Sequence, residues 1–238
     1  MRVVLLAAGL GTRLRPLTNK MPKCLVPLGG RPLLEIWLSR LSEAGFGPFL
    51  INVHHLADKV KAFIAESAFR PSVEIFEEPI LLGTAGTVHA NLAFFQGGDG
   101  MVVHADNYCL ADLADFKKAH EERTKGSEIT MMTFETDRPS SCGVVQLDAR
   151  GVVSAFYEKV EDPPSNLANA AVYIFSREIL SAFPNVADIS TEVIPKYLGR
   201  IQTYHTKESL IDIGTPQALE EAQRIAELRR INTANPGI

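Results

Sequence analysis

Short apolar runs alternate with segments of helical periodicity along most of this chain. Residues 2–8 are apolar from Val3 onward and predict a buried strand. From Leu34 to Leu41 apolar side chains recur on one helix face, and Gly45 marks the end of that helix. The further expected strands are 49–54, 73–77, 101–105, 129–136, 143–147, 152–158, 170–175 and 209–212, and the further expected helices are 57–67, 84–95, 112–125 and 216–230. This alternation predicts an α/β fold, a layered mixed sheet with helices on both faces.

The second half of the chain departs from simple alternation. The expected strands 143–147 and 152–158 flank Asp-Ala-Arg-Gly, which predicts a hairpin, and residues 160–168 predict a loop. These segments indicate a small inserted β lobe within one domain that spans residues 1–238. Near the end, Thr215 and Pro216 predict a helix start, with a hydroxyl cap before a first-turn proline. The polar tail, residues 232–238, is expected to fray.

The first expected strand runs into a glycine turn followed by cations. Gly9 and Gly11 can adopt positive φ and lack a Cβ, so successive N–H groups can approach phosphate oxygens closely. Arg13 offers a planar fork for two phosphate oxygens, and Lys23 a compact charge on a flexible stem. The pattern predicts a nucleotide site, although an ordinary strand-to-helix turn with surface cations would also contain the two glycines.

Two common nucleotide-binding loops are excluded by their own spacing. Leu14 stands where the dinucleotide fingerprint requires its third glycine. A P-loop requires Gly-Lys followed by Ser or Thr, and that string does not occur. Asp106 follows the expected strand 101–105, so it can share one crevice with the glycine turn at the carboxyl ends of parallel strands. Asp106 and the asparagine after it also suit a simple turn.

Composition and net charge exclude two classes of binding partner. A net charge of −4 and a pI near 5.9 argue against nucleic acid as a partner, since binding a phosphate backbone requires a basic surface. No apolar run reaches the roughly 18 residues of a membrane span, so no membrane partner is expected. Cys24, Cys109 and Cys142 are odd in number and widely spaced, which predicts free thiols. A cytoplasmic protein is the expectation.

The sequence resembles the sugar-1-phosphate nucleotidylyltransferases, the family of the GDP-mannose, UDP-glucose and dTDP-glucose pyrophosphorylases. Its motifs are closest to those of the mannose-1-phosphate guanylyltransferases. The matching segments, in family order, are 6–16, 22–23, 82–86, 105–107, 142–145, 158–159, 169–173 and 212–216. The resemblance covers residues 1 to about 220 and implies the Rossmann-like nucleotide-diphospho-sugar transferase fold. The left-handed β-helix domain of some relatives is not expected.

The resemblance implies a reaction and a set of site residues. A phosphate oxygen of a sugar 1-phosphate would attack the α-phosphorus of an NTP, giving an NDP-sugar and pyrophosphate. Arg13 and Lys23 would be catalytic, and Asp106 and Asp212 would bind Mg²⁺. The implied nucleotide-binding residues are Leu6, Ala8, Gly9, Gly11, Thr12, Arg13, Lys23, Glu78, Pro79, Gly83 and Thr84, and the implied sugar-phosphate residues are Asn107, Gly143, Glu158, Lys159, Asn169 and Val172. A homodimer is a family-based expectation.

The choice of base depends on Glu78. Related thymidylyl and uridylyl enzymes typically carry glutamine there, whereas a glutamate offers only acceptors, which match the N1–H and N2–H₂ donors of guanine. GTP with mannose 1-phosphate is therefore favoured. The alternatives are a heptose-1-phosphate guanylyltransferase and a thymidylyl- or uridylyltransferase acting on glucose 1-phosphate or another sugar 1-phosphate. A cytidylyltransferase is less favoured, because it should lack the full set of segments 158–159 and 212–216. A catalytically silent subunit is less favoured, because the motif cations and carboxylates are all present.

Overall fold

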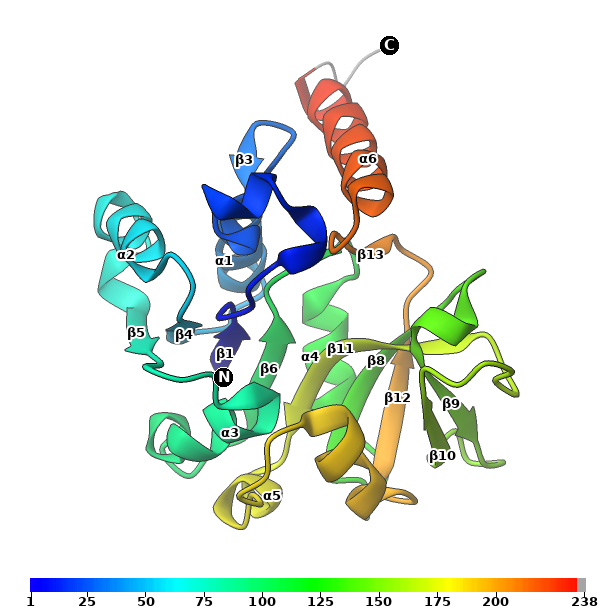
Figure 1. Cartoon of the computed structure of the whole chain (residues 1–238). Coiled ribbons are helices and arrows are strands. Elements are labelled where there is room, and N and C mark those ends of the chain that lie inside the picture. Colours follow the sequence, from blue (N-terminus) through cyan, green and yellow to red (C-terminus); the bar gives the residue numbers. More distant parts are fainter. Residues whose placement is uncertain (235–238) are drawn as a thin grey trace.

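The structure is a computed structural model that describes residues 1–234. Strands and helices alternate through the first half, and strands dominate the second (Figure 1). The strands are β1 Arg2–Leu6, β2 Pro27–Leu28, β3 Arg31–Pro32, β4 Phe49–Val53, β5 Val73–Glu77, β6 Gly100–His104, β7 Asn107–Cys109, β8 Ile129–Glu135, β9 Gly143–Leu147, β10 Val153–Glu158, β11 Leu167–Phe175, β12 Ile201–His205 and β13 Leu210–Asp212. The α-helices are α1 Leu33–Glu43, α2 Ala57–Glu66, α3 Gly83–Ala90, α4 Leu113–Glu121, α5 Arg177–Ser181 and α6 Pro216–Ala234.

One mixed sheet organises the molecule. Strands β6, β1, β4 and β5 are neighbours in that order and all parallel, so their carboxyl ends meet at one edge. Strand β11 continues the sheet antiparallel to β6, and it also pairs with β8 and β9. The parallel half thus carries the first part of the chain, and the antiparallel half extends it toward the hairpin of β9 and β10 (Figure 1).

Helices cover both faces of this sheet, as predicted. Successive residues of β1 alternate between two cores: Val3 and Leu5 pack with α1, whereas Val4 packs with α3 and α5. A strand buried on both faces reads as a continuous apolar run, which is why β1 shows no polar alternation. Trp37 of α1 anchors the first core, and its indole N–H donates to the Asn107 carbonyl at 2.7 Å. Within residues 1–234, no helix combines the length and apolar character needed to cross a membrane.

The predicted hairpin is confirmed, and several other expectations are corrected. Strand β12 was not predicted, because Ile201–His205 contains only two large apolar side chains and gains its stability by pairing with β8. The expected loop 160–168 ends early, since β11 already begins at Leu167. The expected helix 84–95 divides at Asn91, whose side chain donates to the Thr87 carbonyl, and a 3₁₀ turn follows at Leu92–Phe95.

The C-terminal helix begins as predicted and ends later. The Thr215 hydroxyl accepts from the Ala218 N–H at 3.2 Å, which is the expected N-cap. The predicted fraying from residue 232 is wrong, because α6 runs to Ala234. The first strong helix breaker after residue 216 in the sequence is Pro236, so nothing in residues 232–234 stops the helix. The rest of that expected tail, 235–238, lies outside the described residues.

Candidate active site

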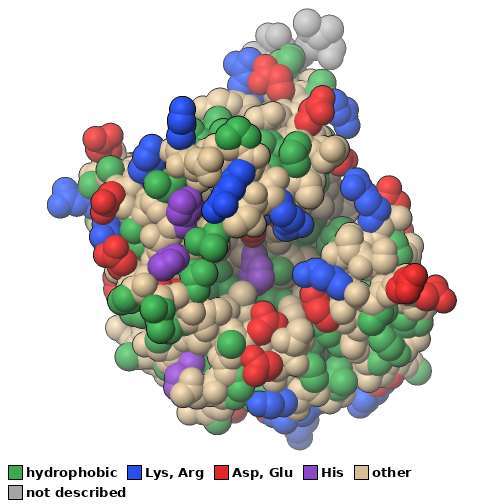
Figure 2. Space-filling model, viewed as in Figure 1, with side chains coloured by type: hydrophobic (Ala, Val, Ile, Leu, Met, Phe, Trp, Pro, Cys, Tyr) green, Lys and Arg blue, Asp and Glu red, His purple; other side chains and the backbone are tan. Residues whose placement is uncertain are grey.

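A cleft opens where β1 and β6 end side by side. The two strands are parallel neighbours, with Leu6 opposite His104, so the segments that follow them leave the same edge of the sheet. The cleft has a volume of about 340 Å³. It is lined by Gly9, Leu10, Gly11, Thr12, Arg13, Lys23, Asp106 and Gly214. Figure 2 shows a central hollow on this face with Lys and Arg side chains along its rim. The predicted crevice shared by Asp106 and the glycine turn is confirmed.

The glycine turn is held in shape from outside the cleft. Gly11 has φ 60°, and a Cβ on it would lie 2.8 Å from Cγ2 of Thr18, so this position requires glycine. The Thr18 hydroxyl donates to the Gly11 carbonyl at 2.7 Å. Among residues 1–234, the backbone N–H groups of Gly9 and Gly11 have no hydrogen-bond acceptor. The turn lines the cleft and has backbone donors that no group of the described chain uses.

A buried amide and carboxylate connect the end of β1 to the loop before α3. Asn52 accepts from the Ala7 N–H at 2.6 Å and donates to Oε1 of Glu78 at 2.8 Å. The Thr87 hydroxyl donates to the same oxygen at 2.5 Å, and the Leu82 N–H donates to Oε2 at 3.1 Å. Glu78 is only 2% exposed, so this structure uses its carboxylate to hold the loop. Recognition of guanine by Glu78 stays a prediction, and it requires these bonds to rearrange.

Asn52 was missed by sequence reasoning, although it carried a signal. It is the only polar residue in the apolar run Phe49–Val53, and it is 3% exposed. A lone amide inside a strand that is buried on both faces must find partners, because an unpaired buried polar group is costly. Its partners are the backbone beside the glycine turn and Glu78, so Asn52 fixes two sides of the cleft relative to each other.

The start of α3 is fastened to a segment from the second half of the chain. Gly83 has φ 80°, and a Cβ there would lie 2.3 Å from the Ala187 carbonyl oxygen. The Thr84 hydroxyl donates to Asp188 at 3.2 Å and accepts from the Ile189 N–H at 2.8 Å. Gly83 and Thr84 are thus built into a backbone junction, while Pro79 lies exposed in the loop before them. Their contacts with a nucleotide stay predictions.

Lys23 lies between the two predicted metal carboxylates. Its Nζ is 2.6 Å from Oδ2 of Asp106 and 2.6 Å from Oδ1 of Asp212. The lysine side chain is 8% exposed, and those of the two aspartates are 36% and 50% exposed. Burial is the largest single influence on Asp106 and raises its pKa, but the charge of Lys23, the hydrogen bond from Lys23 and a backbone hydrogen bond act together against it and hold that pKa below its usual value. The Asp106 carboxylate is therefore ionised at neutral pH, and the Lys23 ammonium lies between it and Asp212.

A two-stranded ribbon brings these distant carboxylates together. Asp106 follows β6, and the chain continues directly into β7, which pairs antiparallel with β13 so that Asn107 lies opposite Asp212. The Ile213 N–H donates to the Asp106 carbonyl at 3.2 Å and closes the ribbon at this end. The pairing of β7 with β13 thus fixes the separation of the carboxylates independently of any ligand.

Arg13 approaches the same centre from the exposed side. Its Nη2 is 3.4 Å from Oδ2 of Asp212, and its side chain is 66% exposed. A Cβ on Gly214 would lie 2.5 Å from that nitrogen, so the arginine fits here only because position 214 has no side chain. The Gly214 N–H also donates to Asp212 at 2.9 Å. Gly214 belongs to the motif 212–216 but was not predicted as a site residue. The structure shows its role, which is to leave room for Arg13 beside Asp212.

The predicted sugar-side residues form a second group on the antiparallel half. Glu158 ends β10 opposite Gly143 of β9, and a Cβ on Gly143 would lie 2.6 Å from the Glu158 carboxylate. Lys159 follows with φ 50°, and its exposed Nζ is 3.1 Å from Glu158. Asn169 donates to the Tyr173 hydroxyl and accepts from the Ala171 N–H, which shapes the bulge of β11.

Two of these predicted residues offer little surface to a ligand. Val172 is 0% exposed and packs in the core beneath the cleft. Asn107 is 6% exposed, and its amide donates to the Ala170 carbonyl at 3.0 Å. Binding of a sugar phosphate by Val172 and Asn107 stays a prediction and needs the cleft to rearrange. Burial lowers the pKa of the nearby His104, and among residues 1–234 its buried Nε2 has no hydrogen-bond partner.

Comparison with known proteins decides the family. The model of the family described as Nucleotidyl transferase matches residues 2–228. The chain belongs to the nucleotidyl transferase family. This membership confirms the resemblance stated from the motifs.

Relatives within the nucleotidyl transferase family differ in the substrates that their names carry. The chain is 33% identical to the mannose-1-phosphate guanylyltransferase of Mycobacterium tuberculosis, over 90% of this chain and 61% of that protein. It is 30% identical to the UTP–glucose-1-phosphate uridylyltransferase of Synechocystis, over 100% of this chain and 66% of that protein. The chain thus spans about three fifths to two thirds of the length of these curated relatives.

Two solved structures have the same fold as this chain. HddC from Yersinia pseudotuberculosis, in complex with GMP-PN, superposes with a TM-score of 0.79 at 26% identity, covering 94% of this chain and 98% of HddC. A putative glucose-1-phosphate thymidylyltransferase from Bacillus anthracis has a TM-score of 0.83 at 20% identity, covering 95% of each chain, which shows the fold alone. The predicted α/β class, with helices on both faces of a mixed sheet, is confirmed.

Proposed function

We propose that this protein transfers a nucleoside monophosphate from an NTP to a sugar 1-phosphate, with GTP and mannose 1-phosphate as the preferred pair. The observation that carries the proposal is the Lys23 bridge between Asp106 and Asp212, which borders a glycine turn with unpaired N–H donors. Cations, hard oxygen ligands and backbone donors in one cleft are the groups that nucleotidyl transfer needs.

The chemistry assigns these groups complementary roles. A phosphate oxygen of the sugar 1-phosphate forms a bond to the α-phosphorus of the NTP, and the bond from that phosphorus to the bridging oxygen of pyrophosphate breaks. The N–H groups of Gly9 and Gly11, with Arg13, hold the departing pyrophosphate as its negative charge grows. Lys23 adds a compact charge at the same place. Catalysis then comes from alignment and charge stabilisation, with no covalent intermediate on the protein.

The donor set fits Mg²⁺. This ion is usually bound through one or two carboxylates together with substrate phosphates. Asp106 and Asp212 supply two carboxylates, and no group of three or more His, Cys, Asp or Glu side chains with metal-binding geometry occurs within residues 1–234. Asp106 and Asp212 would hold the ion, which supplies charge neutralisation for the phosphates when it is bound.

The names of two similar proteins support guanine as the base of the nucleotide. The Mycobacterium tuberculosis relative is named a guanylyltransferase, and HddC was solved with GMP-PN. The Synechocystis relative, named for UTP and glucose 1-phosphate, matches the whole chain at 30% identity and supports the main alternative. The same cleft can serve either base, because the groups that hold the triphosphate are shared. A heptose 1-phosphate in place of mannose 1-phosphate is an alternative of the same reaction type.

The sugar phosphate is assigned to the second group of residues. Lys159 presents an exposed ammonium at the edge of the β9–β10 hairpin, and Glu158 beside it presents acceptors for sugar hydroxyls. This separation gives a two-substrate cleft, with the triphosphate at the glycine turn and the sugar phosphate on the antiparallel half of the sheet.

The test is a matrix of GTP, UTP, dTTP, ATP and CTP against mannose, glucose and heptose 1-phosphates with Mg²⁺, measured as pyrophosphate release. GTP with mannose 1-phosphate is expected to have the highest kcat/KM. Arg13→Ala should lower it for every active pair, whereas Arg15→Ala, which removes an exposed arginine two residues away, should not. A preference for UTP or dTTP would reject the guanine assignment, and no pyrophosphate with any pair would reject the reaction.

A further inference from the structure

We infer that in the free protein the Lys23 ammonium occupies the position between Asp106 and Asp212 that a metal ion would take. The ammonium must move away from the two carboxylates before the ion can bind them. This inference rests on the proposed function, because it assumes that Asp106 and Asp212 are the metal ligands. It concerns a role of Lys23 before catalysis, distinct from its contact with the triphosphate.

The first support is the position of the ammonium. Nζ lies at the same 2.6 Å distance from one oxygen of each carboxylate, which is short for an N–H···O contact and typical of charge-assisted bonds. A divalent ion held by both carboxylates has to approach the same pair of side chains. Two cations sharing them would repel each other strongly in a partly buried site. Lys23 and the ion therefore bind in competition.

The second support is that the fold forces the carboxylates together. The pairing of β7 with β13 fixes Asp106 and Asp212 near each other whether or not a ligand is bound. Two adjacent carboxylates without a cation would repel each other. In the free protein the Lys23 ammonium lies between them and offsets this repulsion, so the two side chains stay close together before the substrate arrives.

The third support is that Lys23 can move without a change in the backbone. Its main chain is fixed by the 3₁₀ turn Lys23–Leu25 and by the buried Cys24 that follows. Its stem runs beside the glycine turn, since a Cβ on Gly11 would lie 3.5 Å from Cβ of Lys23. Rotation about the side-chain bonds can thus carry the ammonium from the carboxylates toward phosphates held by the turn.

Arg13 cannot take over the bridging position as the structure stands. It contacts only Asp212, at 3.4 Å, through the oxygen that Lys23 does not use. Its side chain is mostly exposed, so solvent screens its charge. Lys23 is therefore the cation whose removal exposes the carboxylates to an incoming ion.

The consequence is a coupling between nucleotide and metal. Phosphates that attract Lys23 free the carboxylates for the ion, and an ion on the carboxylates frees Lys23 for the phosphates. Each ligand therefore raises the affinity for the other, as linkage requires. Without a nucleotide, a divalent ion has to displace Lys23 unaided and binds weakly.

The experiment measures Mn²⁺ binding without turnover, from the electron paramagnetic resonance signal of free Mn²⁺. The wild type is compared with Lys23→Gln and Lys23→Met, and with Lys20→Gln as the matched control, an exposed lysine three residues away. Lys23→Gln retains a donor for the carboxylates and serves where Lys23→Met does not fold, as judged by its circular dichroism spectrum. Without nucleotide, both Lys23 variants should bind Mn²⁺ about tenfold more tightly than the wild type, a change of about 1.4 kcal/mol. Lys20→Gln should match the wild type.

The outcomes separate the inference from the proposed function. Equal Mn²⁺ affinity in the wild type and the Lys23 variants overturns the competition while leaving the metal site in place. Absence of Mn²⁺ binding to all proteins, with and without a non-hydrolysable NTP analogue, overturns the metal assignment and the inference together. Failure of every substrate pair in the pyrophosphate assay, with tighter Mn²⁺ binding by the variants, rejects the proposed reaction and supports the competition.

Discussion

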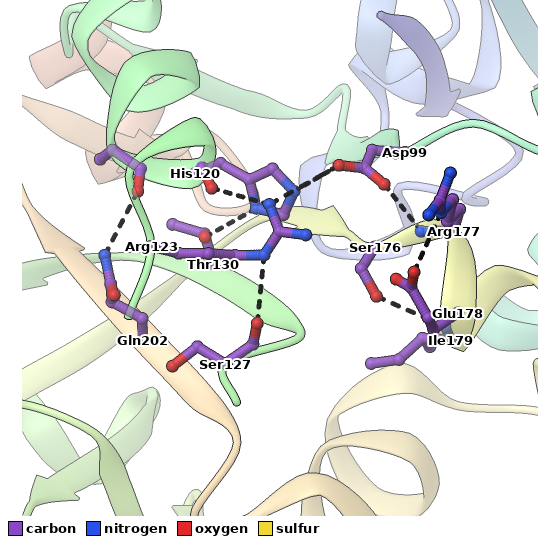
Figure 3. A network of polar contacts seen from close by, with 11 residues as sticks. Asp99, His120, Arg123, Ser127, Thr130, Ser176, Arg177, Glu178, Ile179 and Gln202 are labelled. Carbon is purple, nitrogen blue, oxygen red and sulfur yellow. Dashed lines mark hydrogen bonds and ion pairs between the residues drawn. The ribbon is translucent and has the colours of Figure 1, made fainter. Parts of the chain in front are cut away.

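Two carboxylates, Asp99 and Asp106, flank β6 at its opposite ends, and their partners differ. At the amino end, Asp99 contacts Nε2 of His120 at 3.1 Å and accepts from the Arg177 N–H at 2.8 Å (Figure 3). The other ring nitrogen of His120 contacts the Thr130 hydroxyl at 2.8 Å. At the carboxyl end, Asp106 and Asp212 share Lys23 across an open cleft. One cluster is closed on itself, and the other faces a volume that a ligand can fill.

The two clusters also differ in how each charge is compensated. His120 is fully buried, and burial lowers its pKa to about 4, with the charge of Arg123 acting in the same direction. The imidazole is therefore neutral at pH 7 and serves as a hydrogen-bond connector between α4, β8 and the start of β6 (Figure 3). The cation of the closed cluster is Arg123, 3.7 Å from Asp99, so one cation faces one carboxylate there, whereas at the cleft one ammonium lies between two carboxylates. If the proposed function holds, the amino end of β6 serves stability and the carboxyl end serves catalysis.

The largest expected effect comes from removing a carboxylate at the cleft. Asp106→Ala should lower kcat by about 100-fold or more, because the cleft loses one of the two proposed metal ligands and Lys23 loses a partner. The melting temperature should stay close to that of the wild type, since the side chain faces the cleft. Asp137→Ala, at an aspartate whose side chain is 91% exposed, is the matched control. Turnover by Asp106→Ala at the wild-type rate would remove Asp106 from the site.

The second effect tests the junction between α3 and the 187–189 segment. Gly83→Ala combines an unfavourable φ with a contact of 2.3 Å to a backbone oxygen. It should reduce the free energy of unfolding by about 3 kcal/mol or more. Gly30→Ala has a similar φ of 83° with nothing within 4 Å, and it should cost roughly 1–2 kcal/mol. Urea unfolding of both variants separates the cost of backbone strain from that of the clash. Equal losses in the free energy of unfolding would contradict close packing of Gly83 against Ala187.

The third effect concerns the closed cluster. Thr130→Val keeps the shape of a fully buried side chain but leaves one nitrogen of His120 without its partner. The free energy of unfolding should fall by about 1–3 kcal/mol. Activity per folded molecule should be unchanged. Thr133→Val, on the same strand with a long 3.5 Å bond to the Tyr204 carbonyl, should cost less. A loss of activity in Thr130→Val without a loss of stability would contradict the division between the two ends.

The last effect is a pH dependence, which contributes least at neutral pH and grows as the pH falls. The pKa of His120 is about 4 in the folded protein and about 6.5 in the unfolded chain. Between these values the unfolded chain binds a proton that the native protein does not, so His120 contributes stability above pH 6.5 that is lost as the pH falls toward 4. The slope from this group is at most about 1.4 kcal/mol per pH unit. Urea unfolding of His120→Gln across this range should lack that part of the slope, and an unchanged slope would show that His120 titrates normally.

Much of the fold could be predicted because the parallel strands are buried on both faces. Their continuous apolar runs locate β1, β4 and β6 directly, and the helices between them follow from periodicity. Strand β12 could not be predicted in this way, since its side chains alternate weakly and its conformation depends on pairing with β8, about 70 residues earlier in the chain. Tertiary pairing, which local pattern does not encode, accounts for that miss.

The site divides along the same line. Gly11 and Lys23 could be singled out from local chemistry, because a glycine turn with cations suits phosphate wherever it lies. Asp212 came only from the family motif, and its contact with Lys23 spans 189 residues of sequence. The engagement of Glu78 by Asn52 and Thr87 was not foreseen, because the three residues lie on separate elements. These contacts depend on burial and on strand pairing between distant segments, which the local spacing of residues does not indicate.

The most direct test of the central claim is ³¹P nuclear magnetic resonance of the protein with GTP, mannose 1-phosphate and Mg²⁺. Nucleotidyl transfer predicts that the mannose 1-phosphate resonance disappears while the diphosphate resonances of a nucleotide sugar and that of pyrophosphate grow in equal amounts. The same spectra with Lys23→Ala should show almost no product. Formation of GDP and inorganic phosphate, with mannose 1-phosphate left intact, would instead identify the cleft as a hydrolase site and contradict the account.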